Sequence, residues 1–163
     1  MGHCSRHWLM EIKPYSAGQE RFGSWFIRKV GSLQVRVYEL SGGRLWNTFL
    51  GGQVAVLTTT GHTSGKERKV PLLYIEDGER VVMAASKGGM STVPLWFRNV
   101  EANPRVRIQV GSRVREMRAR IADEVEERAY WPRLETMYPG FAEYRARCDG
   151  VRHIPVVIFE PVA

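Results

Sequence analysis

Cysteine is scarce in this 163-residue chain, and several classes of protein are set aside by what it lacks. Its two cysteines, Cys4 and Cys148, are too few for a disulfide framework and form no C-x-x-C pair. No apolar run approaches the ~18–20 residues that a membrane-spanning helix needs. The N-terminus carries charges and histidines without an apolar stretch, so no secretory signal is expected. We therefore expect a cytoplasmic protein.

Familiar nucleotide, metalloprotease and hydrolase motifs are also missing. No G-x-G-x-x-G, H-E-x-x-H or G-x-S-x-G occurs. The stretch Gly61–Lys66 resembles a P-loop only superficially, because its glycines are too closely spaced and Glu67 stands where Ser or Thr should bind Mg²⁺. A nucleoside triphosphatase is therefore excluded. His3, Cys4 and His7 lie on a terminal stretch without clear periodicity, so we expect no metal site there.

The charge balance is basic, with 24 Lys and Arg against 17 Asp and Glu and a formal net charge of +7. Such a protein attracts anions, whether nucleic acid, acidic lipid or a phosphorylated or carboxylate-rich small molecule. Composition does not choose among these partners. The length and the 44% hydrophobic content indicate one globular domain, which we place at residues 21–163 after a flexible arm at residues 1–20.

Periodicity predicts an N-terminal amphipathic helix over residues 21–41. Its apolar residues recur at spacings of three and four: Phe26, Val30, Leu33, Val37 and Leu40. Arg28, Lys29 and Arg36 lie off this stripe. The pattern is typical of a helix packed on a core. The alternative is a basic helix on an anionic surface, such as the inner face of the membrane.

Short β-branched and apolar runs follow after Gly51-Gly52. The predicted strands cover residues 54–60, 69–76, 80–86, 106–110, 114–121 and 154–160. Helices are expected at residues 93–103 and from Asp123, where Glu126 completes a capping box, and Pro132 predicts a kink or restart at Trp131. Strands joined mainly by hairpins, with inserted helices, indicate an α+β fold built on an antiparallel β-barrel rather than a Rossmann sheet.

Two loops stand out chemically. The first is the hairpin loop after Thr60, whose hydroxyls and backbone N–H groups precede Lys66, Arg68 and Lys69; such loops bind anions such as phosphate, and an ordinary solvated hairpin is the alternative. The second, Ser86–Gly89, ends a strand with a hydroxyl, a cation and two glycines. Tyr138, Phe141 and Tyr144 then fall three apart, on one side of a helix that packs in the core or lines a cavity.

Several stretches, taken together, resemble the deazaflavin-dependent nitroreductase family, which includes F420H2-dependent quinone reductases. They are LTTTG…SGKERKVPLLY, AASKGG followed by PLWFRNVEANP, and YWPRLETMYPGFAEY with the closing IPVVIFEP. The resemblance runs from about Arg21 to the C-terminus. It implies an FMN-binding-like split β-barrel and an enzyme in which reduced coenzyme F420 delivers a hydride to a quinone, nitroaromatic or activated alkene.

The resemblance also implies roles for individual residues. The phosphate of F420 is expected at His62, Thr63, Ser64 and Arg68, with Lys69 and Val70 alongside. The deazaflavin ring is expected against Ala84, Ala85, Ser86 and Lys87, enclosed by Leu95, Trp96, Phe97 and Asn99. Further cofactor contacts are expected from Val56, Lys66 and Arg98. The acceptor is expected beside Leu73, Tyr138, Phe141 and Tyr144, with hydroxyl donors from Tyr138, Tyr144 and Ser86. Neither a metal nor nucleic acid is implied.

The chain departs from the family pattern at both ends of this site. His62 and Thr63 stand where family members commonly have two cations, and Lys66 and Lys69 are expected to compensate. Leu73 and Phe141 stand where nitroimidazole-activating members have tyrosine. We therefore expect a more apolar acceptor pocket that suits quinones better than nitroimidazoles.

Two other functions remain as alternatives. A carrier or sensor would bind F420, or a related planar anion, without turnover. A basic barrel could instead bind single-stranded nucleic acid through cations and stacking aromatics, although the aromatics cluster in the C-terminal helical region rather than along exposed strands. Monomer and dimer are both open.

Overall fold

The computed structural model describes residues 15–49 and 51–162, with the backbone alone for Ala17 and residues 21–30. The chain contains both helices and antiparallel strands, which confirms the predicted α+β class. In order, the elements are α1 (Ala17–Leu40), β1 (Thr48–Phe49), β2 (Gly52–Thr60), β3 (Glu67–Leu73), β4 (Ile75–Asp77), β5 (Arg80–Ala84), η1 (Lys87–Gly89), α2 (Leu95–Ala102), β6 (Arg105–Val110), β7 (Arg113–Ile121), α3 (Glu124–Met137), α4 (Gly140–Cys148) and β8 (Val156–Pro161).

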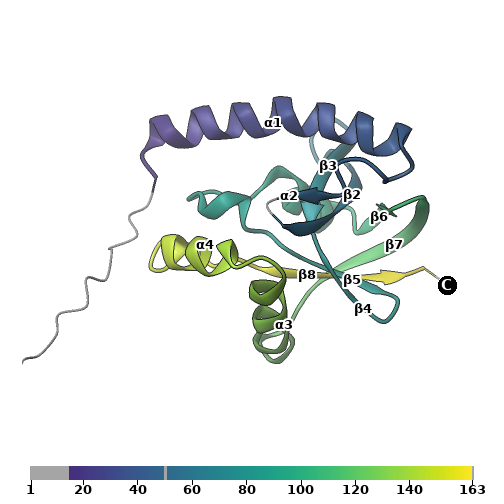
Figure 1. The fold of residues 1–163 in the computed structure, drawn as a ribbon. Helices are drawn as coiled ribbons and strands as arrows, with labels where there is room; N and C mark the ends of the chain where they lie inside the picture. Colours follow the sequence, from purple (N-terminus) through teal and green to yellow (C-terminus); the bar gives the residue numbers. More distant parts are fainter. Residues whose placement is uncertain (1–14, 50, 163) are drawn as a thin grey trace, which may run out of the picture.

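The described strands form one antiparallel sheet that curls into a half-barrel. Its order is β1-β2-β6-β7-β8-β5-β4, and β3 pairs with the other edge of β2. Figure 1 shows α1 along one side of this sheet and α3 and α4 on the opposite side. The strand expected at residues 69–76 divides at Tyr74 into β3 and β4.

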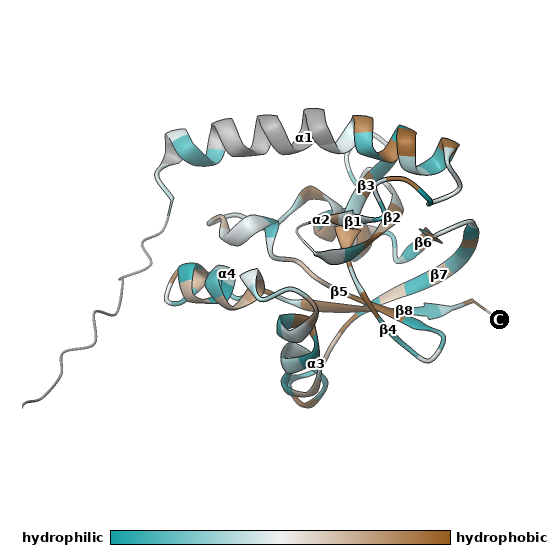
Figure 2. Cartoon of the chain, in the orientation of Figure 1, coloured by the Kyte–Doolittle hydropathy of each residue, from teal (hydrophilic) through white to brown (hydrophobic). Residues whose placement is uncertain are grey.

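The apolar parts of β5 (Val81–Ala84) and β8 (Val156–Phe159) are buried on both faces (Figure 2), whereas Arg80 and Glu160 lie at the less buried strand ends. Along β5, Val81 and Met83 point into the barrel core beside α2, whereas Val82 and Ala84 join a second core under α3 and α4. This alternation is the two-residue period of a strand. The sheet thus separates a barrel core from the aromatic core of the C-terminal helices.

Helix α1 buries a different face from the one that its apolar spacing predicts. Leu33 and Leu40 are 55% and 90% exposed, so the predicted stripe is wrong in this half, and the side chains of Phe26 and Val30 lie outside the described residues. The buried face instead carries Val35 and Tyr38.

The physical reason is that the buried face of α1 also satisfies polar groups. The Tyr38 hydroxyl accepts a hydrogen bond from the Gly111 amide at 2.8 Å, and the Gln34 side chain donates to the Trp46 carbonyl at 3.2 Å. Gly31 lies beside Pro71 of β3, since a Cβ there would make an ordinary van der Waals contact with the proline ring at 3.5 Å. The spacing of apolar residues alone does not predict these contacts.

Helix α3 begins as predicted but continues past its proline. The Asp123 side chain accepts from the Val125 and Glu126 amides, and Glu126 accepts from the Asp123 amide, which confirms the capping box. The predicted restart at Trp131 is wrong, because one helix runs from Glu124 to Met137 with Pro132 inside it. Packing of this helix against the aromatic core outweighs the loss of one backbone hydrogen bond.

Glu126 also links α3 to β7, which generates a stability prediction. Its two carboxylate oxygens accept from the Arg120 guanidinium at 2.7 and 2.8 Å, and this contact lowers the pKa of Glu126 to about 2. Since the folded pKa lies below the ordinary 4.5, the pair stabilises the fold at neutral pH and loses this effect as pH falls from about 4.5 to about 2. We expect Glu126→Gln to lower the free energy of unfolding by roughly 1 kcal/mol near neutral pH, measured by urea unfolding.

The matched control is Glu124→Gln in the same helical turn. Its carboxylate is almost fully exposed and reaches Arg128 only at 4.0 Å, so its loss should change stability by no more than a few tenths of a kcal/mol. The deficit of Glu126→Gln should shrink toward pH 3, and a deficit that does not depend on pH would contradict the assignment.

Candidate functional site

The hairpin loop between β2 and β3 is fastened to α2 by one buried amide, Asn99. The Asn99 carbonyl oxygen accepts from the His62 backbone amide at 3.0 Å and contacts His62 Nδ1 at 2.8 Å. Its amide nitrogen donates to Thr59 Oγ1 at 2.9 Å, and that hydroxyl donates to the Arg68 carbonyl. Because a buried amide must be hydrogen-bonded, this network sets the position of the loop relative to α2.

The two cations at the exit of the loop point to opposite faces of β3. Arg68 pairs with Thr59 across the strands, and its guanidinium donates to Ser64 Oγ at 3.4 Å. Lys69 instead lies on the α1 side, where its ammonium donates to Glu39 at 2.7 Å. The strand period thus separates residues that are adjacent in sequence.

The remaining donors of the loop suit an anion. His62, Thr63, Ser64, Lys66 and Arg68 are all exposed. The neighbouring acid, Glu67, is already paired with Arg107 and with Lys69. No carboxylate of residues 61–66 competes for the loop, since that stretch contains none. Its exposed hydroxyls and cations therefore form a donor set that fits a phosphate group.

The second predicted loop follows β5 and has an unusual backbone. Lys87, Gly88 and Gly89 all have positive φ, at 48°, 66° and 76°. The Lys87 ammonium donates to Thr92 Oγ1 at 2.6 Å. Gly89 permits close packing on α4, because a Cβ there would lie 3.1 Å from the backbone of Tyr144. This loop thus brings the predicted ring site against the C-terminal aromatic segment.

An arginine that was not singled out from the sequence holds this loop from behind. Arg152 follows α4, and its guanidinium donates to the carbonyls of Ala85, Ser86 and Met90. The Cys148 thiol also contacts the Met90 carbonyl, at 3.7 Å. No motif marks Arg152, because a side chain that binds only backbone carbonyls needs no recognisable partner residue.

The predicted acceptor residues lie close together, either within the aromatic core or packed against it. Tyr138 and Phe141 are buried in the aromatic core, and Leu73 and Tyr144 pack against it. The Tyr138 and Tyr144 hydroxyls lie 3.1 Å apart. Burial, together with this hydrogen bond, raises the pKa of Tyr144 above its ordinary value, so its phenol remains protonated at neutral pH.

Several other residues predicted to contact the ring are buried and would support it from below; they do not form an exposed wall. Ala84, Ala85, Ser86, Trp96 and Phe97 are buried. Leu95 and Arg98, on the outer side of α2, are exposed, whereas Val70 is partly buried against the barrel core. Val56 lies on the other face of β2, in the small cluster that it forms with Val35 and Tyr38 beneath α1. The structure therefore separates an exposed rim from a buried floor.

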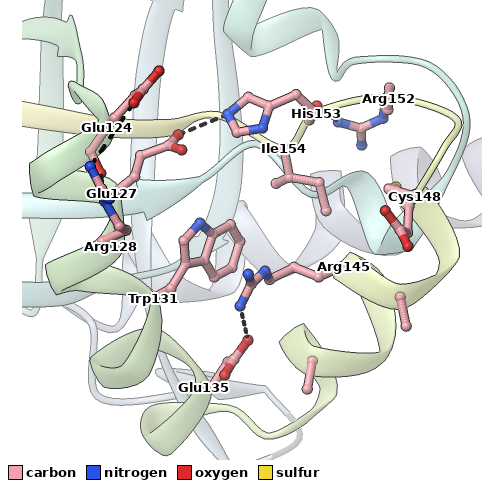
Figure 3. A pocket seen from close by; sticks show the side chains of 13 residues that line it. Glu124, Glu127, Arg128, Trp131, Glu135, Arg145, Cys148, Arg152, His153 and Ile154 are labelled. Carbon is pink, nitrogen blue, oxygen red and sulfur yellow. Dashed lines mark hydrogen bonds and ion pairs between the residues drawn. The ribbon is translucent and has the colours of Figure 1, made fainter.

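A hollow of about 900 Å³ lies elsewhere, between α3, α4 and the segment before β8. None of the predicted site residues lines it. Figure 3 shows Trp131 and Arg145 within it, together with the pairs Glu127–His153 and Glu135–Arg145. Because acidic and basic side chains both line it, the hollow offers no donor set of one sign for an anionic cofactor. Arg152, at its edge, connects it to the predicted ring site.

The part of the chain that the structure describes holds neither a membrane-spanning helix nor a metal-binding cluster. Within residues 15–49 and 51–162, no helix has the length and apolarity needed to cross a bilayer. Across the same described residues, His, Cys, Asp and Glu side chains form no group of three that could bind a metal ion. His3, Cys4 and His7 lie outside this part of the chain.

Comparison with known sequences identifies relatives over most of the chain. Residues 30–161 match the family model of the F420H(2)-dependent quinone reductases. The Mycobacterium tuberculosis protein Rv3178 is 40% identical over 98 residues, which cover 60% of this chain and 81% of that protein. F420H(2)-dependent quinone reductase Rv1261c of the same species is 36% identical over 92 residues, which cover 53% of this chain and 62% of the relative.

Solved structures give the same result for the fold. The F420-H2 dependent reductase FDR-A is 42% identical and superposes with a TM-score of 0.61, over 66% of this chain and 93% of that one. A domain-swapped dimer is 35% identical with a TM-score of 0.64, over 84% of this chain and 98% of its own. Both structures resemble this chain in sequence and in backbone fold.

Proposed function

The chain belongs to the F420H(2)-dependent quinone reductase family, an oxidoreductase family whose cofactor is reduced coenzyme F420. From that premise we propose which residues bind the cofactor and which face the acceptor. The hairpin loop binds the phosphate of the cofactor. The loop after β5 and helix α2 support the ring, and the tyrosines of the C-terminal segment face a quinone-like acceptor. When bound, reduced F420 supplies a hydride to that acceptor.

The network centred on Asn99 is the observation that carries this proposal. It joins an exposed, cation-bearing loop to α2, whose buried side chains pack beneath the predicted ring site. The phosphate-binding end and the ring-supporting end are thereby held in one rigid frame. Such a frame fixes the orientation of a large ligand, which is the protein's main contribution when a cofactor supplies the chemistry.

At the phosphate end, Arg68 and Ser64 are the central pair in this proposal. The Arg68 guanidinium already reaches Ser64 Oγ, so an anion between them would receive a charge-assisted hydrogen bond and a hydroxyl bond. Lys66 adds a second exposed cation from the same loop. Lys69 supports them indirectly, because its bond to Glu39 holds β3 against α1.

At the acceptor end, Leu73 and Tyr144 are partly exposed, and the Tyr138 and Tyr144 hydroxyls lie beside them. Phe141 is buried in the aromatic core, and Leu73 packs against it. The Tyr144 hydroxyl bonds to Tyr138 and can donate to an acceptor oxygen that gains negative charge. This combination suits a flat, weakly polar quinone better than a nitroimidazole.

The direct test is optical. Purified protein mixed with reduced F420 and menadione should restore the absorbance of oxidised F420 at a rate proportional to protein concentration. The heat-denatured protein is the control. Binding of F420 without this turnover would replace the reductase by a carrier, and absence of binding would defeat both functions. Salt-dependent oligonucleotide binding in place of F420 binding would instead favour a nucleic-acid role.

Arg68→Met tests the phosphate end. Loss of a charge-assisted hydrogen bond costs about 1.5–3 kcal/mol, so the Kd for F420 should rise roughly 10- to 100-fold in a fluorescence titration. Arg107→Met is the matched control, because it removes an exposed cation of the neighbouring strand that pairs with Glu67 on the α1 side of the sheet. Its Kd should stay within about twofold of wild type. Equal affinities of Arg68→Met and wild type would reject the assignment.

Tyr144→Phe tests the hydroxyl donor. Removing a hydrogen-bond donor to a developing oxyanion lowers turnover about 100-fold or more in well-studied sites, and we expect kcat with menadione to fall at least about tenfold. Tyr130→Phe is the matched control, because Tyr130 belongs to the same core but donates its hydroxyl to Asp77 at 2.8 Å. It should change stability and leave kcat near wild type. An unchanged kcat in Tyr144→Phe would remove Tyr144 from the reaction.

A further inference from the structure

We propose that Arg152 is a positioning residue, which sets the place of the loop Ala85–Met90 and through it the alignment of cofactor and acceptor. This inference rests on the proposed function. Arg152 Nε donates to the Met90 carbonyl at 2.8 Å, Nη1 donates to the Ala85 carbonyl at 3.2 Å, and Nη2 donates to the Ser86 carbonyl at 2.6 Å. One guanidinium therefore fastens both ends of the loop.

The loop needs such a fastening because its backbone is strained. Lys87 has a φ of 48°, a region that residues with a Cβ seldom adopt, and Gly88 and Gly89 follow with positive φ. Conformations of this kind persist only where the surrounding structure holds them, and they concentrate at functional sites. The carbonyls that Arg152 binds immediately flank this strained turn.

The contacts are also specific for a guanidinium. Arg152 binds a fourth carbonyl, that of His153, at 3.0 Å, and within the described residues no carboxylate forms an ion pair with it. A guanidinium presents five N–H donors in a planar fork, whereas an ammonium is a compact point charge. A lysine at this position would keep the positive charge but could not bind both ends of the loop together.

The position of the loop matters because its far side touches α4. Gly89 lies against the backbone of Tyr144, the proposed donor, and Ala85 and Ser86 lie in the predicted ring floor. A second anchor keeps the loop near its place without Arg152, because the Ala85 amide donates to the Pro155 carbonyl at 2.9 Å. Loss of Arg152 should therefore displace the turn while the barrel stays folded.

The test compares Arg152→Lys and Arg152→Met with wild type. A misplacement of about 1 Å can lower turnover about 100-fold, so we expect kcat with menadione to fall roughly 10- to 100-fold in both variants. The Kd for F420 should rise less than about fivefold, since the phosphate-binding hairpin is untouched. In the protein without cofactor, amide hydrogen exchange within residues 86–90 should become at least about tenfold faster.

Arg133→Met is the matched control. Its guanidinium also fastens two elements, because it donates to the Asp77 carboxylate and the Glu76 carbonyl and so ties α3 to β4. It should lower the melting temperature, yet leave kcat and the exchange of residues 86–90 unchanged.

Each outcome is decisive. Either wild-type turnover or wild-type exchange in Arg152→Lys would overturn the positioning role, as would an equal fall in kcat in Arg133→Met, which would show a general effect of stability. If Arg152→Met does not fold, the lysine variant still decides. A wild-type protein that fails to oxidise reduced F420 would refute the proposed function, whereas the exchange measurement would still report on the clamp.

Discussion

The register between β2 and β3 is the constraint on which the rest of the site depends. It pairs Thr59 with Arg68 and Thr58 with Lys69, so successive cations face opposite sides of the sheet. A slip by one residue would turn Arg68 toward α1 and Lys69 toward the loop, or it would exchange the two faces of β2, both of which are buried. The apolar residues of β2 prevent this slip, because Leu57 fills the barrel core while Val56 packs under α1.

A series of hydrogen bonds between side chains and backbone groups connects the hairpin loop to the far end of the site. Asn99 ties the hairpin loop to α2, Arg152 ties the loop after β5 to the segment after α4, and Glu20 of α1 accepts from the Ser91 amide at 2.6 Å. Each contact joins elements far apart in sequence, and each places a polar side chain on backbone groups. The loops that carry the proposed binding residues are therefore held by polar contacts, whereas the strands beneath them are held by apolar packing.

The sequence predicts most elements but not how they pack. Strand periodicity, the capping box at Asp123 and the glycine turns depend on residues near in sequence, so those features could be anticipated. The buried face of α1 could not, because it depends on Gly111 and Trp46, which belong to other segments. The role of Arg152 could not be predicted for the same reason, because its partners are backbone carbonyls of a distant segment. The burial of Phe141, and of the floor beneath the ring site, likewise follows from contacts that no local pattern records.

The separation of polar and apolar ends also limits which acceptors the site can favour. The cations proposed to bind phosphate belong to the hairpin loop, whereas Phe141 belongs to the aromatic core and Leu73 packs against it. Since an apolar surface gains little from a polar or charged acceptor and more from a flat hydrophobic one, discrimination at that end depends chiefly on buried area. In the proposed function, the two tyrosine hydroxyls act after binding, on the charge that the reaction creates. Selection of the acceptor and stabilisation of its reduced form are thus assigned to different side chains of one cluster.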